Sequence, residues 1–133
     1  MSAEGRFFDT NVVLYLLSAE TAKADKAEAL LAEGGTISVQ VLNEAGSVMR
    51  RKLSMDWDAI LEVLDGVKQV LDIRPLTLEV HERGHAIAQE TGFGVYDSLI
   101  LAAAAEAGAG VLYTEDMQAG RTVHGVSLIN PFA

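Results

Sequence analysis

The sequence GRFFD at residues 5–9 combines two aromatic side chains with a terminal acid. A short apolar run of this kind predicts a buried β-strand, and Asp9 would stand at its carboxyl end. The apolar run from Val12 to Leu17 follows at once and predicts a helix. A strand that leads straight into a helix is typical of α/β folds.

The alternation of strands and helices continues along the chain. Further β-prone runs predict strands at residues 36–39, 72–74, 111–114 and 126–129. Helical periodicity or composition predicts helices at residues 22–33, 40–53, 57–71, 77–91 and 96–107. The last of these helices is almost wholly apolar and should be central. We therefore expect a single α/β domain over residues 1–133, built around a mainly parallel sheet.

The composition narrows the range of functions. Half of the 133 residues are hydrophobic and 22% are charged, which is typical of one compact domain with a sizeable core. The net charge of −9 argues against a protein that holds polyanions by bulk electrostatics. The absence of cysteine excludes disulfides and thiolate zinc sites. It is compatible with a cytoplasmic location, and no apolar run is long enough for a membrane span.

Acidic residues stand at the predicted strand ends and helix starts. Asp9 and the pair Glu115 and Asp116 end two predicted strands, while Glu44 and Asp97 fall near the starts of two predicted helices. In a parallel sheet, ligands bind beyond the carboxyl ends of the strands, so these acids can converge on one rim. Each acid taken alone is also explained by a helix cap, a turn or a solvated helix face.

Four segments together resemble the PIN-domain nucleases, and most of all the VapC-type toxins of prokaryotic toxin–antitoxin pairs. The segments are FDTNVV at residues 8–13, VLNE at 41–44, YDSLI at 96–100 and LYTEDM at 112–117. The ending NPF at residues 130–132 also agrees, so the resemblance runs from Arg6 to Phe132. It implies a PIN-like three-layer sandwich with helices on both faces of the sheet.

In that family four acids hold divalent metal ions, and the matching positions here are Asp9, Glu44, Asp97 and Asp116. Asn11 and Thr114 match the neighbouring polar positions that support the site. Glu115 stands beside Asp116 and leaves the fourth ligand open between the two. Because alternate residues of a strand face the same side, residues 114 and 116 share a side, and we choose Asp116.

The chemistry of the four acids agrees with the resemblance. Carboxylates suit hard cations such as Mg²⁺ or Mn²⁺, which take oxygen ligands, and clustered carboxylates repel one another unless cations neutralise them. The resemblance implies a Mg²⁺- or Mn²⁺-dependent endoribonuclease, the toxin of a type II toxin–antitoxin system, with the four acids as catalytic residues. It also implies an RNA substrate, a cognate antitoxin and a homodimer.

A competing motif stands at residues 81–85, where HERGH matches the zinc-hydrolase pattern H-E-x-x-H. His81 and His85, one helical turn apart, could hold zinc with Glu82 as general base and Glu106 as a third ligand. Gly84 weakens a helix at this point, and the flank reads as a solvated helix face. A zinc hydrolase and a catalytically inactive PIN-fold binding module are therefore the two alternatives.

Overall fold

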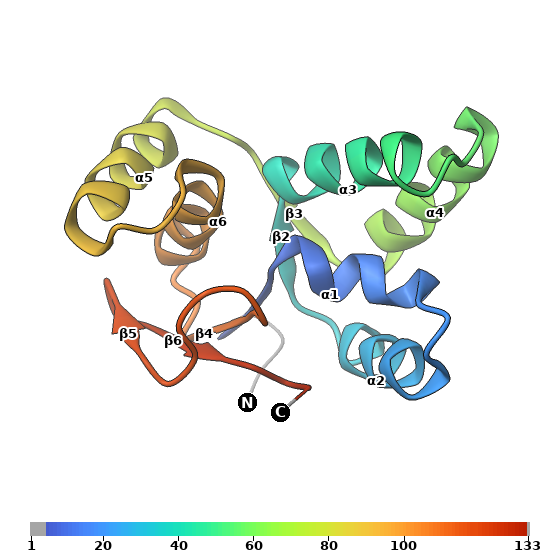
Figure 1. Cartoon of the computed structure of the whole chain (residues 1–133). Coiled ribbons are helices and arrows are strands. Elements are labelled where there is room, and N and C mark those ends of the chain that lie inside the picture. Colours follow the sequence, from blue (N-terminus) through green and yellow to red (C-terminus); the bar gives the residue numbers. More distant parts are fainter. Residues whose placement is uncertain (1–4, 133) are drawn as a thin grey trace.

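The computed structural model describes residues 5–132 as a central sheet between helices (Figure 1). The strands are β1 (Arg6–Phe8), β2 (Thr36–Ser38), β3 (Asp72–Arg74), β4 (Val111–Tyr113), β5 (Thr122–Val123) and β6 (Val126–Ile129). The helices are α1 (Thr10–Leu14), the 3₁₀ turn η2 (Tyr15–Leu17), α2 (Thr21–Ala32), α3 (Val39–Arg51), α4 (Trp57–Val70), α5 (Leu78–Thr91) and α6 (Val95–Glu106).

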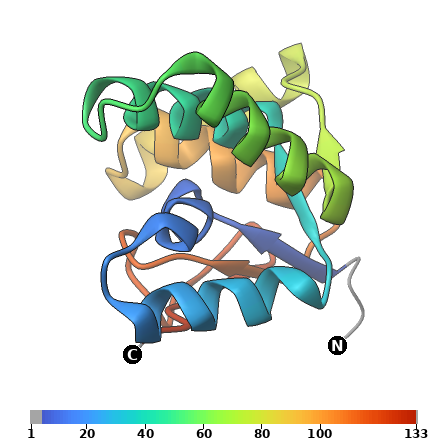
Figure 2. The same cartoon turned by 90° about the vertical axis from the view of Figure 1, so that its right-hand side faces the viewer.

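The strands are ordered β3-β2-β1-β4-β6-β5, and every neighbouring pair is parallel except β5 and β6. Helices α1 to α4 lie on one side of the strands, whereas α5 and α6 lie on the other (Figure 1). In both views α1 lies between α2 and α4 (Figure 2). The expected mainly parallel sheet with helices on both faces is therefore confirmed.

The strand order reverses its direction between β1 and β4. From β1 the chain steps outward to β2 and β3, and after α5 and α6 it returns to β4 on the other side of β1. Crevices for ligands form at such switch points, beyond the carboxyl ends of the strands. Asp9 follows β1 and Thr114 follows β4, so both residues lie at this switch point.

The core explains why these segments adopt their structures. The buried strand residues Phe7, Phe8, Ile37, Leu112 and Leu128 pack in one cluster with the helices. Every residue of α6 from Ser98 to Ala104 is buried, as its apolar sequence predicts. Side chains cap the long helices α3, α4 and α5, because Ser38, Asp56 and Thr77 accept hydrogen bonds from the backbone N–H groups three residues ahead.

The structure differs from the sequence-based expectation in local detail. Strand β5 was not expected: it pairs Val123 with Val126 across a two-residue turn at His124 and Gly125, whose φ angles of 48° and 80° are those of a type I′ hairpin. Val39 belongs to α3 rather than to β2, and Thr114 lies just beyond β4. Within residues 5–132, none of the helices has the length and apolar character needed to span a membrane.

Candidate active site

Asp9 is fixed by two hydrogen bonds at the switch point. Its Oδ1 accepts the backbone N–H of Thr10 at 2.7 Å and caps α1, while its Oδ2 accepts the hydroxyl of Thr114 at 2.7 Å. The backbone N–H of Asp9 also donates to the carbonyl of Tyr113 at 3.0 Å, which extends the pairing of β1 and β4. Asp9 is 2% exposed, so its carboxylate is held in one orientation inside the rim.

The pKa of Asp9 is raised from 3.8 to about 7. Burial is the largest cause, and the negative charges of Asp97 and Asp116 raise the pKa further. The hydrogen bonds from Thr114 and Thr10 lower the pKa and offset only part of that effect. Asp9 therefore lacks a compensating positive charge, which is the environment that a bound cation would complete.

Glu44 is brought to the same rim by α3, which starts directly after β2. The helix is capped by Ser38, and Glu44 lies in its second turn, partly buried. The hydroxyl of Thr10 donates to Glu44 Oε2 at 3.3 Å, which links the acid to the segment that holds Asp9. Burial raises the pKa of Glu44 and the charge of Asp97 adds to this, whereas hydrogen bonds from Gln40 and Thr10 lower it.

Asp97 reaches the rim from the opposite side of the sheet. It lies in the first turn of α6, where the helix dipole favours a negative charge. Its side chain is partly buried, and burial raises its pKa, with the charge of Asp116 as the second cause. Asp97 also contributes to the raised pKa of Asp9 and of Glu44. Mutual repulsion thus connects all four predicted acids.

Asp116 is exposed in the turn that follows β4, and Asn11 on α1 donates a side-chain hydrogen bond to its Oδ2. The hydroxyl oxygen of Thr114 accepts the backbone N–H groups of Asp116 and Met117 at 3.2 and 3.3 Å. Because the same hydroxyl donates to Asp9, one threonine positions both the turn and the first acid. Asn11 and Thr114 therefore both contact an acid of the predicted set.

Glu115 takes a different direction from Asp116. Its Oε2 accepts the hydroxyl of Tyr15, and its Oε1 lies 3.5 Å from the ammonium group of Lys23. These contacts occupy the Glu115 carboxylate on the side of η2 and α2. The electrostatic links to Asp9 and Asp97 belong to Asp116. The geometry thus favours Asp116 over Glu115 as the fourth member of the cluster.

Two residues beside these acids were missed by the sequence analysis. Thr10 touches Asp9 through its backbone and Glu44 through its hydroxyl, and Gln40 hydrogen-bonds Glu44 from one helical turn earlier. The spacing of Gln40 and Glu44 by four residues was the available signal, since such residues are neighbours on a helix face. Thr10 follows Asp9 in the sequence, and from its position alone it is expected only to begin a helix.

The oxygen atoms of the four acids are of the kind that binds hard divalent cations. The set consists of carboxylate oxygens, which Mg²⁺ and Mn²⁺ prefer, and its members repel one another as they stand. Among residues 5–132, no three His, Cys, Asp or Glu side chains are close enough to hold a metal ion in their present positions. The four acids nevertheless share one electrostatic field, because their charges raise one another's pKa values.

The histidine motif lies elsewhere, on the exposed side of α5. The rings of His81 and His85 have their centroids 4.3 Å apart, and Nδ1 of His85 lies 2.9 Å from the backbone carbonyl of His81. Glu106, the expected third ligand, pairs with Arg83 at 3.1 Å instead. In the part of the chain that the structure describes, the two histidines thus gain no third ligand.

Solved structures of similar fold come from bacterial toxin–antitoxin pairs. A chain of a toxin–antitoxin complex from Klebsiella pneumoniae is 22% identical with a TM-score of 0.70, covering 96% of this chain and 98% of that one. A chain of DNA-bound VapBC from Salmonella typhimurium is 19% identical with a TM-score of 0.71, covering 96% and 97%. The Mycobacterium tuberculosis toxin VapC20, described as cleaving the sarcin–ricin loop, is 20% identical with a TM-score of 0.69, covering 85% and 91%.

No curated protein sequence matches this chain significantly. The solved structures share its fold over nearly the whole length but are less than 25% identical. The PIN domain, as a sequence family, matches residues 6–124 and so includes all four acids of the rim. This match covers most of the 133 residues, and the chain therefore belongs to the PIN-domain family.

Proposed function

We propose that this chain is a divalent-metal-dependent endoribonuclease and the toxin of a type II toxin–antitoxin system. The observation that carries the proposal is the acid cluster Asp9, Glu44, Asp97 and Asp116 at the switch point of a PIN-domain fold. Structures of the same fold include a toxin described as cleaving the sarcin–ricin loop and a chain of a toxin–antitoxin complex. These relatives support the choice of RNA as the substrate.

The four acids are proposed to hold Mg²⁺ or Mn²⁺. Such ions, when bound, lower the pKa of an attacking water and stabilise the attacking and leaving oxygens of a phosphodiester. The protein's own contribution is orientation: Thr114 holds Asp9 and the turn of Asp116, while Thr10 holds Glu44 against α1. Asn11 fixes the side chain of Asp116. No side chain needs to act as a nucleophile.

The experiment compares RNA cleavage by the wild type and by four isosteric variants. We expect cleavage only with Mg²⁺ or Mn²⁺, and we expect Asp9→Asn, Glu44→Gln, Asp97→Asn and Asp116→Asn each to lower the rate at least about 100-fold, because each removes a charged ligand. Circular dichroism checks that the variants remain folded. Full activity in any two of them would overturn the four-acid assignment.

A histidine variant separates the zinc alternative from the proposed nuclease. The double variant His81→Ala with His85→Ala removes both ligands of the H-E-x-x-H motif and leaves the rim untouched. We expect it to cleave RNA at the wild-type rate. A folded wild type that binds divalent ions and RNA but never cleaves would instead support the inactive binding module.

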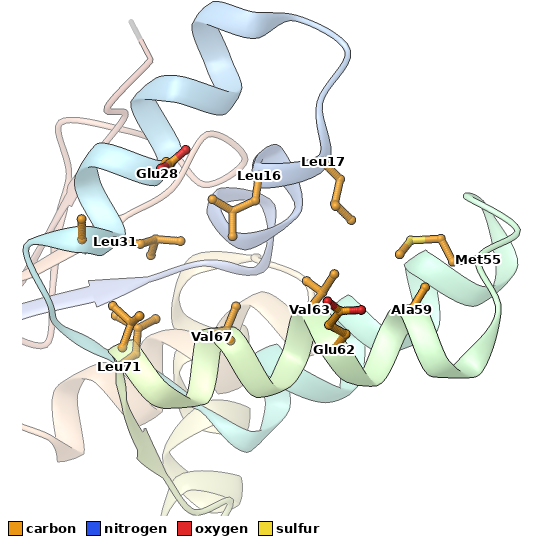
Figure 3. A pocket seen from close by; sticks show the side chains of 13 residues that line it. Leu16, Leu17, Glu28, Leu31, Met55, Ala59, Glu62, Val63, Val67 and Leu71 are labelled. Carbon is orange, nitrogen blue, oxygen red and sulfur yellow. The ribbon is translucent and has the colours of Figure 1, made fainter.

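An apolar groove supports the proposed antitoxin partner. The groove, of about 650 Å³, lies between α4 on one side and η2 and α2 on the other. Figure 3 shows Leu16 and Leu31 pointing towards Val63 and Val67 across it. Glu28 and Glu62 are the two charged residues of its lining. We propose that the antitoxin lays an apolar segment here and sends an Arg side chain to the acid rim.

We also propose that the chain works in the cytoplasm, with which its lack of cysteine is compatible, and that its working unit is a homodimer, as the resemblance to VapC-type toxins implies. Size-exclusion chromatography with light scattering tests this state directly. A monomer at micromolar concentration would remove the dimer from the proposal without affecting the acid rim.

A further inference from the structure

A second hollow connects the acid rim to a basic region of the surface. It has a volume of about 320 Å³, and its lining includes Gln40, Asn43, Glu44, Ser47, Arg51 and Tyr96. Glu44 belongs to the acid cluster, and Arg51 ends α3 two helical turns further on. The hollow therefore runs along α3 from the proposed metal-binding acids to a cation.

The guanidinium group of Arg51 is held at the edge of this hollow, where it can bind an anion. Its Nε donates to Ser47 Oγ at 2.9 Å, which holds the guanidinium beside the hollow. Among residues 5–132, Arg51 is one of several cations that form no ion pair with a carboxylate, so its charge is not neutralised by a neighbour. Arg50 and Lys52 flank it in the sequence. In a chain of net charge −9, this group is a local exception.

Tyr96 lines the same hollow from the other side of the rim. It lies in the first turn of α6, directly before Asp97, and 64% of its surface is exposed. A tyrosine with this exposure leaves much of its ring in water, and the flat ring is suited to stack on a nucleic-acid base. Aromatic platforms beside cations are the usual elements of single-strand binding.

The distance along α3 from Glu44 to Arg51 corresponds to a few nucleotides of a single strand. Arg51 is the seventh residue after Glu44, which is a rise of about 10.5 Å along a helix. Stacked nucleotides of one strand rise about 3.4 Å each, so the hollow spans about three of them. We propose that it seats the RNA segment next to the scissile phosphate, with a base on Tyr96 and a phosphate on Arg51. This inference rests on the proposed endoribonuclease function.

The alternative for Arg51 is purely structural. A cation in the last turn of a helix interacts favourably with the helix dipole, and such a role would affect stability rather than RNA binding. The two roles differ in a measurable way. A plot of log affinity against log salt concentration has a negative slope. Removing one phosphate-binding cation from a single-stranded complex makes that slope about 0.7 less steep, whereas removing a cation that serves only the helix dipole leaves it unchanged.

The test measures RNA binding without cleavage. Full-length protein carrying Asp97→Asn is titrated against a fluorescent single-stranded RNA of mixed sequence in Mg²⁺, and anisotropy is followed at several salt concentrations. In this background Arg51→Ala should weaken binding and reduce the salt slope by about 0.7. Tyr96→Ala should raise the Kd between about 5- and 150-fold, the equivalent of about 1–3 kcal/mol, without changing the slope.

Matched variants guard against indirect effects. Tyr96→Phe keeps the ring and should bind like the Asp97→Asn parent. Lys26→Ala removes one exposed positive charge on α2, outside the hollow, and should leave both Kd and slope nearly unchanged. Thermal melts confirm that each variant is folded.

The outcomes keep this inference separate from the proposed function. No RNA binding by the Asp97→Asn parent, an unchanged slope in Arg51→Ala, or equally weakened binding in Tyr96→Phe and Tyr96→Ala would each overturn the subsite. If the wild type cleaves RNA but any of these overturning results is found, the proposed subsite is wrong and the nuclease function stands. If the binding results hold but the wild type never cleaves, the subsite stands and the nuclease function fails.

Discussion

Two threonines organise the acid rim at the scale of single residues. Thr114 donates to Asp9 and accepts the N–H groups of the turn that carries Asp116. Thr10 donates its N–H to Asp9 and its hydroxyl to Glu44. The rim is therefore a connected polar network rather than four independent acids, and loss of one threonine should disturb two acids at once.

The residues of the rim were predictable to different degrees. The acids follow from strand ends, helix starts and the resemblance to PIN domains, because those positions are fixed by topology. The role of Thr10 depends on side-chain directions across α1 and α3, which sequence spacing does not give. The choice between Asp116 and Glu115 likewise required the contacts of Glu115 with Tyr15 and Lys23.

The raised pKa of Asp9 predicts a pH-dependent stability. The pKa is 3.8 in an ordinary environment and about 7 in the fold, so the folded state holds this proton more tightly. Asp9 therefore contributes stability at low pH that is lost as the pH rises towards about 7. Without divalent ions, the wild type should lose about 2–3 kcal/mol more than Asp9→Asn between about pH 5 and about pH 8. Urea unfolding at both pH values measures the difference.

Divalent ions provide the control for this effect. Mg²⁺ favours the ionised carboxylate, so millimolar Mg²⁺ should flatten the wild-type pH profile and raise its melting temperature at about pH 8. Monovalent salt at matched ionic strength should do less. Parallel pH profiles for the wild type and Asp9→Asn in a chelator would contradict the raised pKa.

At the scale of elements, the sequence located both the long helices and the parallel strands, and it missed one short strand. The helices α3, α4, α5 and α6 are long, and their apolar patterns and caps locate them within one or two residues. The expected bounds of β3 and β6 are confirmed, and β2 and β4 each end one residue earlier than expected. β5 has two residues, and its signal was the His124–Gly125 hairpin turn rather than any apolar run.

The packing of α5 on α6 depends on Gly84. A Cβ at this buried position would lie 2.6 Å from Leu99 Cδ2 and 3.2 Å from Leu99 Cα, so α6 itself would have to move. Gly84→Val should therefore lower the free energy of unfolding by about 1–3 kcal/mol. The measurement is the midpoint of urea unfolding.

The same substitution in an open position separates packing from helix propensity. Gly66 is exposed on α4, and a Cβ there meets no atom within 4 Å. Valine differs little from glycine in helix propensity, so Gly66→Val should change stability by less than about 0.5 kcal/mol. Equal destabilisation of the two variants would show that close packing at Gly84 is not the cause.

At the scale of the whole molecule, charge and shape divide the surface between two proposed partners. The net charge of −9 disfavours RNA over most of the surface, which leaves the acid rim with its proposed cations and the basic end of α3 for the proposed substrate. The apolar groove between α4, η2 and α2 lies on one side of the sheet and is separate from that hollow. A partner held in this groove would reach the rim along α1, which begins directly after Asp9 and leads to η2.

This division predicts how the proposed antitoxin would neutralise the protein. Expression of the chain alone should arrest growth, and co-expression of the protein encoded by the neighbouring gene should restore it. Leu17 on η2 lines the groove and is 38% exposed, so Leu17→Arg should keep the ribonuclease activity but escape rescue, because a charge opposes the apolar segment. Leu78 on α5 lies outside the groove and is 68% exposed, so Leu78→Arg should be rescued like the wild type.

Growth curves and co-purification measure both effects. Rescue of Leu17→Arg would move the antitoxin to another surface, and unaffected growth with all four acids intact would remove the toxin role.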